Sequence, residues 1–249
     1  MTHSISPAIA KRLIVALDYP NVEEARVIIE HLQGIPCTLK VGMQLFYSAG
    51  PDFIRELKSK GYSVFLDLKM HDIPNTVKGG AHSITRLGVD LFNVHASGGR
   101  KMMEAAVEGM ESALTADTSL QRPLLIAVTQ LTSTSQQVMN QEIGIQGTVE
   151  YAVVHYARLA QQSGLGGVVC SPLEVSMIQQ ACGTSFATIT PGVRPAGSDI
   201  GDQTRILTPG QAIAGGSDYL VVGRPITGAH DPREATEQII EEMSLHVND

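Results

Sequence analysis

The sequence predicts a single-domain (β/α)8 barrel spanning residues 1–249, and three observations favour this fold class. Short apolar runs rich in Val, Ile and Leu alternate with longer segments of helical period, the pattern of parallel strands joined by crossover helices. The pattern repeats about eight times, and no linker or low-complexity segment interrupts it. So even a repeat favours a closed barrel over an open doubly wound sheet.

The expected strands are the apolar runs between about residue 12 and about residue 225. In chain order they read RLIVALD, CTLKVG, SVFLDLK, LFNVHA, PLLIAVTQL, GGVVCS, FATITPG and YLVVGRP. In a barrel of this class the carboxyl ends of the strands meet at one mouth, where barrel enzymes place their chemistry.

Two of the connecting segments carry clear signals of helix boundaries. In residues 20–34, Asn21 is expected to cap the helix and Gly34 to end it, with an apolar stripe at Val22, Ala25, Ile29 and Leu32. The last helix is expected in residues 230–243, where Asp231 suits the cap position and a proline follows it.

The composition indicates an ordinary soluble protein, with 43% hydrophobic and 17% charged residues. A formal net charge of -7 and the lack of a basic stripe argue against nucleic-acid binding. Three cysteines without CxxC or Cys/His spacing predict reduced thiols, with no disulfide and no structural zinc. With no signal peptide and no apolar run near the roughly 20 residues that a membrane span needs, we expect a cytoplasmic protein.

Charged side chains converge at the predicted mouth. Because side chains alternate along a strand, Phe65, Asp67 and Lys69 share the face that points to the barrel axis. The same alternation brings Asp18 from the first strand and Lys40 from the second to this mouth. A structural ion-pair network is the alternative interpretation, but desolvation makes buried ion pairs poor stabilisers, so four converging charges favour a function on a charged substrate.

A second group of polar residues follows the last two strands. Loops at these positions often bind phosphate in this fold, and Arg194, Gln203 and Arg224 are the candidates. Either arginine is alternatively a solvated loop residue, and residues 98–100 (GGR) are a weaker competing anion site.

Other polar residues have two interpretations each. Asn93 and His95 share the inward face of the fourth strand, where both are expected to line the pocket. His95 is alternatively a core histidine that bonds to a neighbouring strand. Residues 130–133 (QLTS) form either a base-recognition surface or a helix cap. The sequence contains no metal-binding or nucleotide-binding motif, so no cofactor is expected.

With these residues in view, the chain closely resembles the orotidine 5'-phosphate decarboxylase family of the bacterial type. The segments IVALD, LKVG, FLDLKMHDIPNT, VTQLTS, TPGVRP and VVGRPIT occur in order at the expected strand ends, and the resemblance covers nearly the whole chain. It implies decarboxylation of orotidine 5'-monophosphate to uridine 5'-monophosphate in pyrimidine synthesis, by a cofactor-free homodimer with shared active sites.

The resemblance also assigns roles to residues. It implies a catalytic tetrad of Lys40, Asp67, Lys69 and Asp72. It further implies that Asp72 and Thr76 enter the partner subunit's site, that Asp18 binds the ribose, that Thr132 meets the pyrimidine, and that the phosphate is held by Gln203, Gly223 and Arg224 with Arg194 beside them.

In such a site Lys69 would stabilise the carbanion left at C6 and donate the proton that replaces the carboxylate. Two alternatives remain open. One is a magnesium-dependent enzyme similar to 3-keto-L-gulonate 6-phosphate decarboxylase, and the other is a non-catalytic sensor of a phosphorylated ligand.

Overall fold

The structure, a computed structural model, describes residues 6–195 and 207–246. Eight parallel strands hydrogen-bond in chain order, and β8 pairs with β1, so the sheet is a closed barrel. The strands are β1 (Leu13–Leu17), β2 (Thr38–Gly42), β3 (Ser63–Met70), β4 (Leu91–His95), β5 (Leu124–Val128), β6 (Gly167–Val169), β7 (Ala187–Pro191) and β8 (Tyr219–Val222). The predicted (β/α)8 fold class is confirmed.

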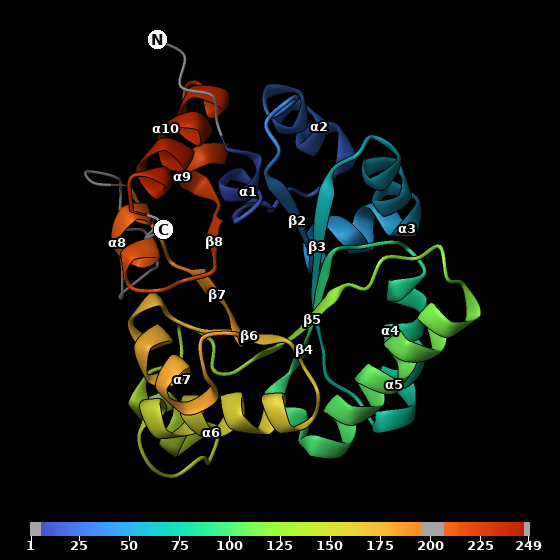
Figure 1. Cartoon of the computed structure of the whole chain (residues 1–249), viewed down its shortest axis with the longest axis vertical. Helices are drawn as coiled ribbons and strands as arrows, with labels where there is room; N and C mark the ends of the chain where they lie inside the picture. Colours follow the sequence, from blue (N-terminus) through green and yellow to red (C-terminus); the bar gives the residue numbers. More distant parts are fainter. Residues whose placement is uncertain (1–5, 196–206, 247–249) are drawn as a thin grey trace.

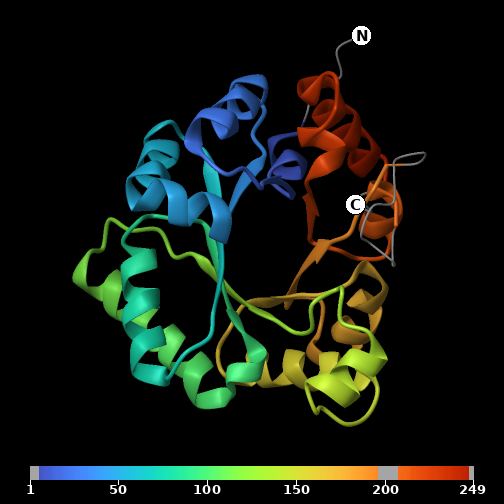
Figure 2. The same ribbon diagram turned by 180° about the vertical axis from the view of Figure 1, so that it is seen from behind.

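Helices surround the strands, and the chain runs once around the barrel (Figure 1). Near the end of the chain, α10 packs beside α1 and α2 and so closes the ring of helices (Figure 2). The helices are α1 (Pro7–Ala10), α2 (Val22–His31), α3 (Met43–Ser59), α4 (Pro74–Thr85), α5 (Arg100–Ala116), α6 (Val149–Gln162), α7 (Val175–Cys182), α8 (Pro209–Ala214), α9 (Arg224–Thr227) and α10 (Pro232–Ser244).

The two faces of the strands pack into two separate apolar clusters. Val64 and Leu66 of β3 face outward into the large layer between strands and helices. Phe65 and Ile14 face the axis and belong to a smaller cluster inside the barrel. The alternation predicted for β3 is therefore present, and it leaves the carboxyl end of the barrel interior to the charged residues.

The helix boundaries follow the predicted caps. The side-chain oxygen of Asn21 accepts the Glu24 backbone N–H at 2.9 Å, and α2 begins at the next residue after this cap. Gly34, just beyond the helix, has a φ of 83° that favours glycine. Asp231 caps α10 in the same way, accepting from the Glu234 N–H at 3.0 Å.

Two strands are shorter than their apolar runs. β5 ends at Val128, and the hydroxyl of Thr129 beyond it donates to the Val169 carbonyl at 3.0 Å. β8 ends at Val222, so that Arg224 is the first residue of α9 rather than the last of a strand.

Candidate active site

A cavity of about 660 Å³ opens at the carboxyl end of the barrel. Asn93 and residues from the other seven β/α units converge on it from the strand ends and the segments that follow them. Among the residues predicted from sequence, those that line it are Asp18, Lys40, Asp67, Lys69, Thr132, Arg194, Gly223 and Arg224.

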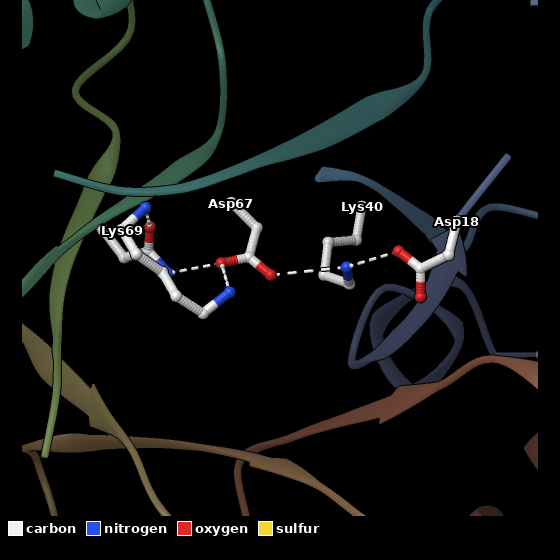
Figure 3. Close-up of polar contacts among 5 residues, drawn as sticks. Asp18, Lys40, Asp67 and Lys69 are labelled. Atoms are coloured by element: carbon white, nitrogen blue, oxygen red, sulfur yellow. Dashed lines mark hydrogen bonds and ion pairs between the residues drawn. The ribbon is translucent and has the colours of Figure 1, made fainter. Parts of the chain in front are cut away.

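Four of these residues form a chain of alternating charge across three neighbouring strands (Figure 3). Asp18 Oδ1 lies 3.1 Å from Lys40 Nζ. The same ammonium lies 3.3 Å from Asp67 Oδ2, and Asp67 Oδ1 accepts a hydrogen bond from Lys69 Nζ at 2.7 Å. Each charged group therefore has an opposite charge as its neighbour.

In this chain of alternating charge, the two middle side chains are buried and the two end side chains are accessible. The side chains of Lys40 and Asp67 are each 10% exposed. Lys69 is 26% exposed and Asp18 is 65% exposed. Both lysines line the cavity, but Lys69 is the more accessible of the two, whereas Lys40 is enclosed between two carboxylates.

The two buried members have shifted pKa values in opposite directions. Burial lowers the pKa of Lys40, but the charges of Asp67 and Asp18 outweigh it and the net pKa is raised. Burial raises the pKa of Asp67, but the charges of Lys40 and Lys69 outweigh it and the net pKa is lowered. Both groups are therefore charged at neutral pH.

Asn93 makes direct hydrogen bonds within this site, which the sequence did not predict. It is 1% exposed, and its side-chain N–H donates to Asp67 Oδ1 at 2.7 Å. Its side-chain oxygen accepts the backbone N–H of Lys69 at 2.8 Å. Strand alternation placed Asn93 on the correct face, but no local signal showed that it bonds to both residues.

The remaining predicted residues have different positions. Asp72 is exposed, and its carboxylate accepts the N–H of Ile73 at 2.6 Å. Asp72 and Thr76 lie outside the lining of the cavity within their own chain. Arg194 is buried and donates to the Val193 carbonyl at 3.0 Å. Gln203 lies outside the described residues.

His95 does not line the cavity but lies beside it. Its ring stands 5.7 Å from that of His71, at a tilted angle. Burial, followed by the charges of His71 and Lys69, lowers the pKa of His95. The His95 ring is therefore mainly neutral at neutral pH.

A second hollow lies at the opposite end of the barrel. This hollow of about 560 Å³ is lined by residues such as Lys11, Lys60 and Tyr62, without a network of paired charges. Within the described part of the chain, no three His, Cys, Asp or Glu side chains are grouped as they would be around a metal ion. No helix in that part is long and apolar enough to cross a bilayer.

The fold and the site define the class of protein: a (β/α)8-barrel enzyme whose carboxyl mouth presents alternating lysine and aspartate side chains to a small molecule. Comparison with known proteins then identifies the family. The chain belongs to the orotidine 5'-phosphate decarboxylase / HUMPS family, whose model matches residues 11–239.

Similar proteins cover nearly the whole chain. The orotidine 5'-phosphate decarboxylase of Bacillus cytotoxicus is 52% identical over 92% of this chain and 96% of its own length. The Bacillus mycoides protein of that name is also 52% identical, with the same coverage. The crystal structure of orotidine 5'-phosphate decarboxylase from Lactobacillus acidophilus matches with a TM-score of 0.83 and 44% identity, covering 93% of this chain and 98% of that one.

Proposed function

We propose that this enzyme decarboxylates orotidine 5'-monophosphate to uridine 5'-monophosphate and carbon dioxide, the last step of de novo pyrimidine nucleotide synthesis. The observation that carries the proposal is the chain of charge from Asp18 through Lys40 and Asp67 to Lys69 at the cavity. The family match and the names of the similar proteins support it.

The reaction needs a cation where Lys69 lies. When the bond between C6 and the carboxylate breaks, carbon dioxide leaves and the electron pair remains on C6, where no carbonyl group or cofactor delocalises it. The Lys69 ammonium attracts this charge and then transfers one proton to C6, and the neutral amine regains a proton from water. An ammonium about 4 Å from a unit negative charge contributes about 4 kcal/mol at an effective dielectric near 20.

The neighbouring charges position this proton donor. Asp67 holds the Lys69 ammonium by a hydrogen bond of 2.7 Å. Lys40 neutralises the other oxygen of that carboxylate, from 3.3 Å. Because Lys40 and Asp67 are buried and bonded on several sides, the donor is oriented before the substrate arrives, which lowers the reorganisation that the reaction requires.

The rest of the cavity accommodates the other parts of the nucleotide. Asp18, largely exposed at the rim, binds the ribose hydroxyls, and Thr132 from the segment after β5 meets the pyrimidine ring. Gly223, Arg224 and Arg194 line the region after β7 and β8 where barrels of this class often bind phosphate. Gln203 is assigned to the same phosphate contact through the family resemblance alone.

The active enzyme is a homodimer in this proposal. Asp72 and Thr76 are exposed and lie outside their own chain's cavity. On the family resemblance we assign Asp72 and Thr76 to the partner subunit's site, where Asp72 completes the tetrad with Lys40, Asp67 and Lys69.

A product assay tests the function directly. Purified protein incubated with orotidine 5'-monophosphate in EDTA is expected to release uridine 5'-monophosphate and carbon dioxide in equal amounts. Loss of activity in EDTA, with recovery on adding magnesium, would support a magnesium-dependent relative instead. Binding of the nucleotide without any product would identify a sensor and refute the proposal.

A further inference from the structure

The Asn93 side chain holds two members of the charged chain at once. Its N–H donates to Asp67 Oδ1 at 2.7 Å, and its oxygen accepts the Lys69 backbone N–H at 2.8 Å. Asp67 Oδ1 is also the oxygen that accepts from Lys69 Nζ at 2.7 Å. One buried amide therefore fixes the carboxylate and the backbone of the lysine that this carboxylate orients.

An irregularity between two strands makes the double contact possible. Leu66 of β3 pairs with Phe92 of β4, and Met70 pairs with Val94, so Asp67–Lys69 lie opposite the single residue Asn93. Extra residues of this kind bend a strand and redirect its side chains, and they are frequent beside active sites. At a regular register, Asn93 would face one residue of β3 instead of three.

The backbone of Lys69 needs such support. Its φ is 51°, and it is the only non-glycine residue in the described part of the chain with a positive φ. This region is unfavourable for a residue with a Cβ atom, so it persists where surrounding contacts enforce it. The Asn93 oxygen supplies one such contact, at the N–H of Lys69 itself.

The orientation of the amide is determined by its two partners. The Lys69 N–H is a donor, so the Asn93 atom facing it must be the oxygen, and the NH2 group must face Asp67. A donor aimed at Asp67 Oδ1 favours the ionised carboxylate over a protonated one. Asn93 therefore contacts the backbone of Lys69 and the carboxylate of Asp67 with a fixed amide orientation.

We propose that Asn93 is a positioning residue for decarboxylation, which acts by holding Lys69 in its left-handed conformation and the Asp67 carboxylate in place beside the Lys69 ammonium. The inference rests on the proposed function, because it assigns Asn93 to the same proton donor. The charged and titratable groups nearby are Asp67 and Lys69 on β3, Lys40 on β2 and His95 on Asn93's own strand.

Two substitutions separate positioning from a purely structural role. Asn93→Ala removes both bonds, and we expect kcat to fall about 10²-fold with KM little changed. Asn93→Asp keeps an oxygen for the Lys69 N–H but places a second carboxylate against Asp67. Protonation of the new carboxyl group restores a donor, so the ratio of variant to wild-type kcat should rise as pH is lowered from about 9 to about 6.

A matched control loses a buried hydrogen bond elsewhere. The hydroxyl of Thr236, fully buried in α10, donates to the Pro232 carbonyl at 2.7 Å. Thr236→Val should lower the unfolding midpoint while leaving kcat and its pH profile as in the wild type. All four proteins are measured with orotidine 5'-monophosphate, and folding is followed by circular dichroism.

The outcomes are distinct. An inactive wild-type enzyme would refute the proposed function. An active wild-type enzyme with an Asn93→Asp profile parallel to its own, or with Asn93→Ala losing stability but not kcat, would refute the positioning role. Failure of both Asn93 variants to fold would also refute it, because the residue would then serve the barrel itself.

Discussion

Replacing Lys69 with alanine removes the one ammonium of the charged chain that we assign to the reacting carbon. Its Nζ lies 2.7 Å from Asp67 Oδ1, and its side chain is 26% exposed toward the cavity. After the substitution, Asp67 keeps Lys40 at 3.3 Å and the Asn93 N–H at 2.7 Å. The buried carboxylate is therefore not left without partners.

The expected loss of activity is large and has two parts. Removing about 4 kcal/mol of attraction to the carbanion slows the reaction about 10³-fold, at 1.36 kcal/mol for each tenfold change. Loss of a positioned proton donor typically costs a further 10²–10⁴-fold. The rate on orotidine 5'-monophosphate should thus fall by about 10⁵-fold or more, whereas the free energy of unfolding should change by only about 1–2 kcal/mol.

The assay measures uridine 5'-monophosphate formation together with urea unfolding. Lys60→Ala is the matched control, because Lys60 pairs with Glu56 at 2.7 Å on the surface, beside the opposite end of the barrel. That variant should retain wild-type turnover. If Lys69→Ala is folded and decarboxylates within about tenfold of the wild-type rate, Lys69 is neither the proton donor nor the main source of stabilisation.

Three further predictions concern the phosphate, the dimer and pH. Arg224→Ala should lower kcat/KM for orotidine 5'-monophosphate far more than for orotidine, since only the nucleotide has the phosphate, and equal losses on both substrates would exclude a phosphate contact. Mixed Lys69→Ala and Asp72→Asn chains should recover roughly a quarter of wild-type activity, because random exchange makes about half the dimers mixed and each mixed dimer has one intact site of two. If mass spectrometry detects mixed dimers but no activity is recovered, Asp72 acts in its own chain's site. Burial raises the pKa of Asp67, but the charges of Lys40 and Lys69 outweigh burial and bring this pKa below its ordinary 3.8. The charge of Asp67 therefore stabilises the fold fully above the unfolded pKa of about 3.9, and this stabilisation is lost as pH falls through the lower folded pKa. The free energy of unfolding of the wild type minus that of Asp67→Asn should therefore be constant near neutral pH and shrink below about pH 4, and a difference that grows on acidification would contradict the lowered pKa.

Much of the site could be predicted because its residues lie on regular strands. Period-two alternation alone predicted that Lys40 and Asp67 point into the barrel, and both line the cavity. It made no prediction for Asp72, which lies beyond β3, where no periodicity applies. The assignment of Asp72 to a partner subunit came from the family resemblance and stays a prediction.

The order of strands and helices, the face on which each strand residue lies, and the chemical types gathered at the barrel mouth follow from the amino-acid sequence alone. These are local properties, since hydrophobic period and caps depend on residues a few positions apart. Two features depend instead on the folded barrel: Asp67–Lys69 lie opposite Asn93 alone, and Lys69 has a positive φ. Register between β3 and β4 depends on how the whole barrel closes, so the amide that joins Asp67 to the backbone of Lys69 is set by contacts between residues 24 and 26 positions apart in the chain.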